Sequence, residues 1–195
     1  MKAFAIAAID QEPDQAFFEK IAEISFAGVD FLLLRDKTLA DPVRWKTAER
    51  CRELILPPVR FLVHGRADLA TDVGADGVHL SGDGPPVESI REHGARIVGR
   101  SCHSVADCAR AEAEGADYAL LGPLFPPRSK PGDRLISREE LVEAAKLDLD
   151  IYALGGISME NLHVLSGSGA AGVAAVSLFL TDRPLEPIME AIRRL

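Results

Sequence analysis

Basic and hydroxyl side chains recur where short apolar segments of this sequence give way to polar ones. Arginine and lysine hold phosphate oxygens through charge-assisted hydrogen bonds, and serine adds a neutral donor. Side chains of this kind gathered in one place indicate an anionic ligand, above all a phosphorylated one. The residues predicted to bind it are Arg35, Lys37, Arg66, Arg100, Ser101, Ser129 and Lys130.

A glycine pair and a serine near the C-terminus predict a second anion-binding element. In the segment 154–158, Leu-Gly-Gly-Ile-Ser, a strand is expected to end and a helix to begin. Unpaired backbone amides at a helix N-terminus attract phosphate, and barrel proteins often place a phosphate after their seventh and eighth strands. The residues predicted to form this cup are Gly155, Gly156, Val176 and Ser177.

Two histidines at predicted segment ends could move protons. Histidine has an ordinary pKa of about 6.5, so it both accepts and donates a proton near neutral pH. His64 and His103 are therefore the predicted acid–base residues. His79 lies inside an apolar segment and is predicted to be structural, and Cys102 is predicted to be a small buried residue rather than a nucleophile.

Apolar segments and amphipathic helical segments alternate along the whole chain, which is typical of a parallel sheet. The apolar segments carry hydrophobic residues at consecutive positions, as strands buried on both faces do. The predicted strands are 3–9, 31–35, 60–64, 77–80, 96–101, 118–122, 150–156 and 172–180. The predicted helices are 14–27, 42–55, 66–74, 85–94, 104–115, 137–147, 158–168 and 183–195.

A repeat of two strand–helix units favours a closed barrel over the alternative, an open doubly wound sheet. The tripeptides at 28–30, 74–76 and 115–117 read Gly-x-Asp, and 169–171 reads Gly-Ala-Ala, each just before an even-numbered strand. Barrel interiors are built in layers from alternate strands, which suits such a repeat. We predict a compact (β/α)8 TIM barrel over residues 1–195 as a single domain, with its site at the carboxyl ends of the strands.

Composition narrows the function further. The 195 residues contain 30 acidic and 22 basic side chains, a net charge of −8, whereas nucleic-acid-binding domains are normally basic. No apolar segment approaches the roughly 18 residues that a membrane span needs. Three cysteines form neither an even disulfide set nor a metal-binding pair, which suits a reducing cytoplasm. Together, charge, apolar segments and cysteines predict a cytoplasmic protein that binds neither nucleic acid nor membrane.

The motifs together resemble those of thiamine phosphate synthases and their relatives, the TenI-like thiazole tautomerases. They follow each other in the family's order along nearly the whole chain. This resemblance implies a (β/α)8 barrel acting late in thiamin biosynthesis. The motifs are Leu-Arg-Asp-Lys at 34–37, Arg-Ala-Asp-Leu-Ala at 66–70, Gly-Ala-Asp-Gly-Val-His-Leu at 74–80, Gly-Ala-Asp-Tyr at 115–118, Gly-Pro-Leu-Phe-Pro at 122–126 and Ala-Leu-Gly-Gly-Ile at 153–157.

The resemblance also implies roles for single residues. Arg35 and Lys37 match the family's basic pair at the pyrophosphate, and Ser101 matches a serine at the end of the fifth strand. Ser129 and Lys130 match the Thr-Lys of the loop after the sixth strand. The thiazole-phosphate cup of the family corresponds to Gly155, Gly156, Val176 and Ser177.

Some positions depart from both branches of the family. The synthase has an Asn-Asp pair where this chain has His64-Gly65, and its second Mg²⁺ aspartate is represented only by Asp83, one position early. Mg²⁺ prefers hard oxygen ligands that include carboxylates, so Mg²⁺ is expected only if synthase activity is retained. The tautomerase histidine before the Val-Phe of the sixth strand is Pro123 here.

Three functions therefore stay open. The first is a TenI-like thiazole phosphate tautomerase with altered acid–base residues. The second is a thiamine phosphate synthase with a degraded Mg²⁺ site, and the third is a non-catalytic barrel that binds a thiazole or thiamine phosphate. The expected partner in all three is a phosphorylated small molecule. The resemblance also allows a homodimer, although no segment of the sequence identifies an interface.

Overall fold

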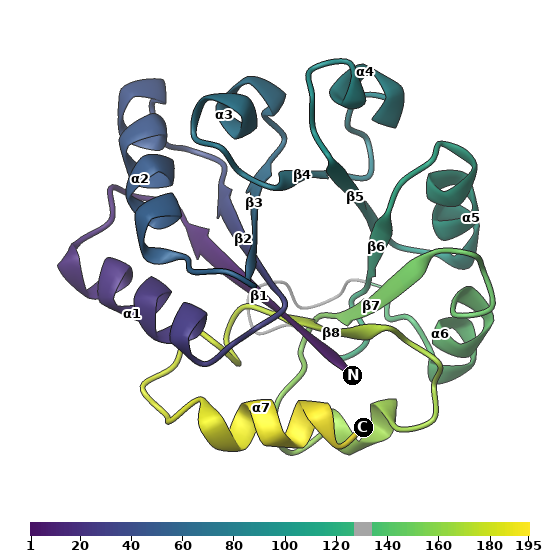
Figure 1. The fold of residues 1–195 in the computed structure, drawn as a ribbon. Coiled ribbons are helices and arrows are strands. Elements are labelled where there is room, and N and C mark those ends of the chain that lie inside the picture. The colour runs from purple at the N-terminus through teal and green to yellow at the C-terminus, as the bar shows by residue number, and fades with distance from the viewer. Residues whose placement is uncertain (127–133) are drawn as a thin grey trace.

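The chain folds as a closed barrel of parallel strands surrounded by helices (Figure 1). The computed structural model describes residues 1–126 and 134–195, and within these the barrel order is β1 to β8 without interruption. The strands are β1 Lys2–Ile9, β2 Phe31–Asp36, β3 Arg60–His64, β4 Gly77–Leu80, β5 Ile97–Cys102, β6 Tyr118–Leu121, β7 Asp150–Leu154 and β8 Gly172–Ala175. The helices are α1 Gln15–Phe26, α2 Asp41–Leu54, α3 Ala67–Asp72, α4 Val87–Arg91, α5 Val105–Ala113, α6 Arg138–Ala144 and α7 Glu186–Arg193, with a 3-10 helix, η1, at Leu162–Leu165.

The predicted barrel is confirmed, and its last two units differ from the prediction. The helix expected over 158–168 is only the short 3-10 helix η1, since glycines at 167 and 169 follow it closely and both take positive φ angles. The strand expected over 172–180 ends at Ala175, and turns follow it. No helix of the described residues is long and apolar enough to cross a membrane.

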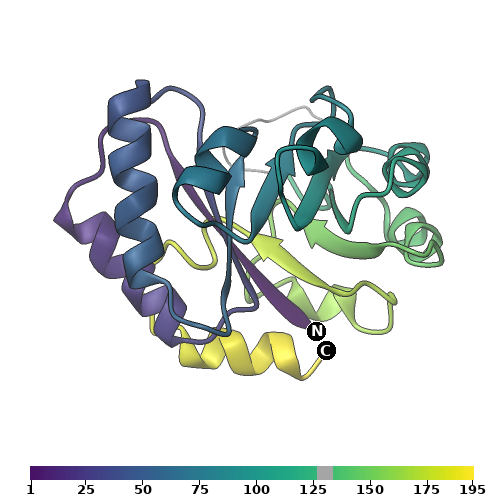
Figure 2. The ribbon, with the colours of Figure 1, turned by 45° about the horizontal axis from the view of Figure 1, so that its top comes forward.

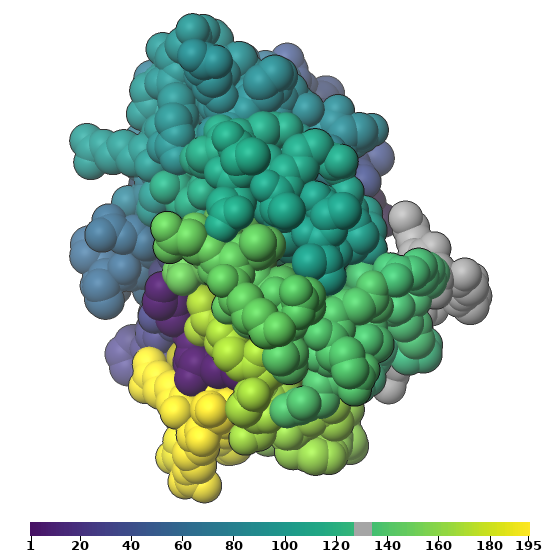
Figure 3. Space-filling view, turned by 90° about the vertical axis from the view of Figure 1, so that its right-hand side faces the viewer, coloured from purple at the N-terminus to yellow at the C-terminus, as the bar shows by residue number. Residues whose placement is uncertain are grey.

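Local sequence explains where several helices begin. Ser137 accepts a hydrogen bond from the backbone N–H of Glu140, whose carboxylate accepts one from Ser137 in return. This capping box pairs two amides that a helix start otherwise leaves free. Helix α6 thereby starts at a fixed residue beside α5, and the space-filling view shows these two helices side by side (Figure 3).

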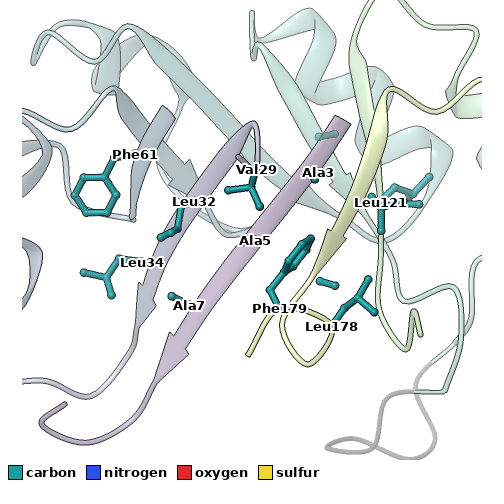
Figure 4. Packing of buried hydrophobic residues seen from close by; sticks show 14 of the residues in the cluster. Ala3, Ala5, Ala7, Val29, Leu32, Leu34, Phe61, Leu121, Leu178 and Phe179 are labelled. Carbon is teal, nitrogen blue, oxygen red and sulfur yellow. The ribbon is translucent and has the colours of Figure 1, made fainter. Parts of the chain in front are cut away.

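Alternation along each strand divides the apolar side chains between two cores. Ala3, Ala5 and Ala7 of β1 face outward toward the helix layer, where Phe179 lies beside this strand (Figure 4). Phe4 and Ile6 face into the barrel. Because strands of period two are buried on both faces, their sequence reads as a continuous apolar run. The helices seen outside the strands in Figure 2 cover the outer core.

Aromatic rings fill the barrel interior toward the amino-terminal ends of the strands. Phe4, Phe31, Tyr118 and Tyr152 lie with ring centroids 5.2 to 6.0 Å apart. Gly99 of β5 makes room for them, because a Cβ at this position would lie 2.0 Å from Cζ of Tyr118. The interior is therefore a packed floor on which a site at the barrel mouth rests.

The Gly-x-Asp repeat fixes how neighbouring strands meet. Asp30, Asp76 and Asp117 each precede an even-numbered strand and accept a hydrogen bond from the backbone N–H of the preceding odd-numbered strand, at 2.7 to 2.8 Å. The glycines two positions earlier take left-handed φ angles of 65° to 80° as the helices end. The repeat thus has a structural cause, which is the same strand-pair junction used three times.

Candidate functional site

A cavity of about 600 Å³ opens at the carboxyl ends of the strands. Its floor contains Ile6, Leu33, Leu120 and Leu154, and polar side chains stand around it. An apolar floor with a few polar groups is the usual form of a small-molecule site. The predicted site residues that line it are Arg35, Lys37, His64, Asp83, Ser101, His103 and Val176.

Arg35 and Lys37 supply the cavity with positive charge. Neither forms an ion pair or side-chain hydrogen bond with another described residue. Asp36, which lies between them in sequence, points to the outer face of β2 and binds Arg44, with Nε 2.9 Å from Oδ1. The alternation of the strand thus separates this carboxylate from the two cations. Both cations remain available to an anionic ligand.

His64 is half-buried at the end of β3 and stays neutral more readily than an ordinary histidine. Burial lowers the pKa of its imidazole, and the positive charges of Arg35 and Lys37 lower it further. A neutral imidazole at physiological pH can accept a proton. Arg35 and Lys37, which are available to an anion, therefore also favour the neutral, proton-accepting form of His64.

Replacing Lys37 with methionine is expected to raise the pKa of His64 toward its ordinary value of about 6.5, since one of the neighbouring positive charges disappears. An NMR titration of the His64 ring protons measures this shift. Lys46→Met, on helix α2 away from the cavity, is the matched control and should leave the titration in place. An unchanged His64 titration in Lys37→Met would contradict the electrostatic contact.

His103 has a defined tautomer. Its Nδ1 lies 2.7 Å from the carbonyl oxygen of Gly122, and its backbone N–H donates to the carboxylate of Asp107. A carbonyl oxygen can only accept, so Nδ1 carries the proton. The neutral ring then has its lone pair on Nε2, for which the described residues offer no hydrogen-bond partner. His103 is therefore available as a base on the cavity wall.

Ser101 and His79 form the polar part of the cavity floor. His79 Nε2 lies 2.8 Å from Oγ of Ser101, and Nδ1 lies 3.0 Å from the hydroxyl of Tyr118. His79 is 1% exposed, and burial lowers its pKa to about 3. It is consequently a neutral hydrogen-bonding group, as the prediction of a structural role implied, and it contacts the cavity.

Arg100 does not face the cavity, and its predicted place at the mouth is corrected. The side chain lies on the outer face of β5, since Gly99 and Ser101 occupy the inner positions. Its guanidinium donates to the carboxylate of Glu114 at 2.8 Å and to the carbonyl of Pro85 at 2.6 Å. Further bonds to three carbonyls of the loop 81–84 make Arg100 a support for that loop.

Arg66 is also turned away from the cavity. It forms a bidentate pair with Asp68, binds Asp41 at 3.2 Å and lies over the Trp45 ring at 4.7 Å. These contacts join the start of α3 to the start of α2. Its position corrects the expectation that it stands with Arg35 and Lys37.

The predicted phosphate cup is only partly as expected. Gly155 and Gly156 take positive φ angles, and a Cβ on Gly156 would lie 2.5 Å from the carbonyl oxygen of Phe125. These glycines therefore let the segment after β6 approach closely, and no α-helix begins behind them. Val176 lines the cavity while Ser177, next to it, is exposed after the end of β8. Ser129 and Lys130 lie outside the described residues.

The family of the chain follows from comparison with known proteins. A family model described as thiamine monophosphate synthase (TMP-TENI) matches residues 4–179. The chain belongs to this family.

Members of the thiamine monophosphate synthase family align over most of the chain. A thiamine-phosphate synthase of Chlorobium luteolum is 38% identical over 161 residues, 77% of this chain and 73% of the relative. One of Thermosynechococcus vestitus is 34% identical over 188 residues, 94% of this chain and 54% of the relative. The solved thiamine phosphate pyrophosphorylase of Pyrococcus furiosus has a TM-score of 0.84 at 25% identity, covering 99% of this chain and 94% of that one.

The described residues do not assemble a Mg²⁺ site of the kind the resemblance implies for the synthase branch. Two carboxylates line the cavity, Asp83 and Asp107. Asp107 already accepts from the backbone of His103 and pairs with Arg110, which leaves Asp83 alone. Within residues 1–126 and 134–195 no three metal-binding side chains come together. One free carboxylate is a poor ligand set for Mg²⁺.

Sequence reasoning missed three residues of the cavity wall. Asp107 and Arg110 extend from the first turns of α5, and their spacing resembles an ordinary helix-surface ion pair. Ser81 lies in the loop after β4 that Arg100 supports. For Ser81 the available signal was its place directly after the predicted strand 77–80, where barrel sites are built, whereas Asp107 and Arg110 lie inside the predicted helix 104–115.

Proposed function

We propose that this member of the thiamine monophosphate synthase family binds a thiazole phosphate in the cavity and shifts a proton on it, as a TenI-like thiazole tautomerase. The observation that carries the proposal is that the cations Arg35 and Lys37 share one cavity with two histidines, His64, whose pKa is lowered, and His103, whose Nε2 has no partner among the described residues. The cations suit the phosphate, and the apolar floor suits the heterocycle.

The residues divide the reaction between them. In this proposal Arg35 and Lys37 bind the phosphate, in place of the glycine cup that the resemblance implies, and fix the heterocycle over Leu120 and Leu154. One of His64 and His103 removes a proton from a carbon of the heterocycle, the electron pair moves through the ring, and a proton returns to another carbon. One C–H bond breaks and one forms, so the composition of the substrate is unchanged. General acid–base catalysis of this kind contributes about 10²- to 10⁴-fold.

The test follows the ligand in D₂O, where a proton shift replaces hydrogen by deuterium. We expect deuterium to enter the thiazole phosphate in the absence of the pyrimidine diphosphate and of Mg²⁺. Binding of thiazole phosphate or thiamine phosphate without exchange would instead indicate the non-catalytic barrel and would reject the tautomerase.

A thiamine phosphate synthase is the second candidate, favoured by the names of relatives 34% and 38% identical to this chain. This reaction joins a pyrimidine diphosphate to the thiazole phosphate and releases pyrophosphate. Pyrophosphate release that depends on Mg²⁺ and on both substrates would select it. The described residues offer Mg²⁺ one free carboxylate, that of Asp83. Because a departing diphosphate needs its negative charge neutralised, this poor Mg²⁺ ligand set argues for the tautomerase.

A further inference from the structure

A chain of three hydrogen-bonding groups runs from the buried interior of the barrel to the cavity. It begins at the Tyr118 hydroxyl, passes through both ring nitrogens of His79 and ends at Oγ of Ser101, with separations of 3.0 and 2.8 Å. Tyr118 belongs to β6, His79 to β4 and Ser101 to β5. His79 and Tyr118 are therefore hydrogen-bonded although their strands, β4 and β6, are not neighbours.

Gly99 allows the hydrogen bond between His79 and Tyr118 to form across β5. In the strand register, Gly99 pairs with His79 on one side and with Tyr118 on the other. The Tyr118 ring occupies the place where a side chain at 99 would stand, and it stacks on the His79 ring with centroids 5.6 Å apart. The arrangement is therefore a built part of the interior rather than a surface contact.

The direction of the hydrogen bonds follows from the buried tyrosine. Tyr118 is 2% exposed, and its hydroxyl has no acceptor other than His79 Nδ1 within the described residues. If Nδ1 carried a proton, the tyrosine hydrogen would be buried without an acceptor, which costs about 1–3 kcal/mol. The tyrosine therefore donates to Nδ1, and the proton of the neutral imidazole is on Nε2.

We infer that Tyr118 and His79 are positioning residues that fix the Ser101 hydroxyl as a hydrogen-bond donor into the cavity. Nε2–H of His79 occupies a lone pair of the serine oxygen, and the serine hydrogen is left to a ligand. Ser101 thus selects a ligand atom that accepts a hydrogen bond, such as a phosphate oxygen or a ring nitrogen, and it does not act as a base. The ligand part of this inference rests on the proposed function, and the hydrogen-bond direction does not.

The direction is tested without a ligand by ¹⁵N NMR of the histidine rings. We expect His79 to show the Nε2–H tautomer and no titration between pH 5.5 and 8.5, because it stays neutral there. In Tyr118→Phe the ring packing is kept and the donor is lost, so both tautomers should appear. An Nδ1–H tautomer in the unchanged protein, or an unaltered tautomer in Tyr118→Phe, would overturn the inference.

Tyr152→Phe is the matched control. Tyr152 belongs to the same aromatic cluster, with its ring 5.8 Å from that of Tyr118, but its buried hydroxyl has no hydrogen-bond partner in the described structure. Its loss should leave the His79 tautomer as it is. A change in the His79 tautomer as large as that in Tyr118→Phe would assign the effect to packing and reject the inferred hydrogen-bond direction.

Binding of a thiazole phosphate, the ligand of the proposed function, tests the effect on Ser101. We expect Ser101→Ala to weaken binding about tenfold in the unchanged protein and no more than about twofold in Tyr118→Phe, where the serine can donate to His79 instead. Equal losses of affinity in the two backgrounds would contradict a Ser101 donor fixed by Tyr118 and His79. If the thiazole phosphate does not bind the unchanged protein, the proposed function fails, and the tautomer measurement still decides whether Tyr118 and His79 fix the Ser101 hydroxyl.

Discussion

Replacing His103 with alanine is expected to lower the turnover of the thiazole phosphate by about 10²- to 10⁴-fold, the usual contribution of a general acid–base group. The side chain lines the cavity, and the Gly122 carbonyl holds its proton on Nδ1. Because the substitution leaves Arg35 and Lys37 in place, the affinity for the ligand should change much less than turnover. The measurement is deuterium exchange at saturating ligand together with the dissociation constant.

His93 provides the control for this experiment. It is also exposed, and its Nδ1 likewise lies 2.7 Å from a backbone carbonyl, that of Ser89, but it follows α4 and does not line the cavity. His93→Ala should keep the full rate. If His103→Ala also kept it, His103 would be excluded as the base, and the same measurement on His64→Ala would decide whether His64 carries the reaction.

Replacing Arg100 with methionine is expected to lower the free energy of unfolding by about 1–3 kcal/mol, since removing the buried guanidinium leaves backbone carbonyls of the loop 81–85 without their donor. Arg100 is 4% exposed, and its guanidinium binds Glu114 and four backbone carbonyls. Methionine fills most of the space without supplying donors. Urea unfolding measures the difference.

Arg66→Met serves as the comparison for this stability measurement. Its ion pairs with Asp68 and Asp41 lie at the protein surface, where such pairs contribute about 0 to 1 kcal/mol. A loss in Arg100→Met no larger than that in Arg66→Met would show that the loop 81–85 holds its shape without the arginine. In that case Asp83 and Ser81 would not depend on Arg100 for their place in the cavity.

The sequence by itself determined the barrel and much of its mouth. Continuous apolar runs such as 31–34 and 61–63 identify strands buried on both faces, and the Gly-x-Asp repeat marks the strand pairs. Barrel sites form at strand ends, so Arg35, His64 and Ser101 could be placed at the cavity from their position after or within those runs. These signals depend only on residues close together in the sequence, so they can be recognised without the tertiary structure.

Only the tertiary structure decided which arginines serve a ligand and which support the fold. Arg35 and Arg100 both lie near strand ends, but strand alternation points the first inward and the second outward to partners far away in sequence. The same holds for His79, whose neutrality and hydrogen-bond direction depend on Tyr118, 39 residues away. Which charges and hydrogen-bonding groups meet is settled by long-range packing, and strand pairing across Gly99 brings this pair together.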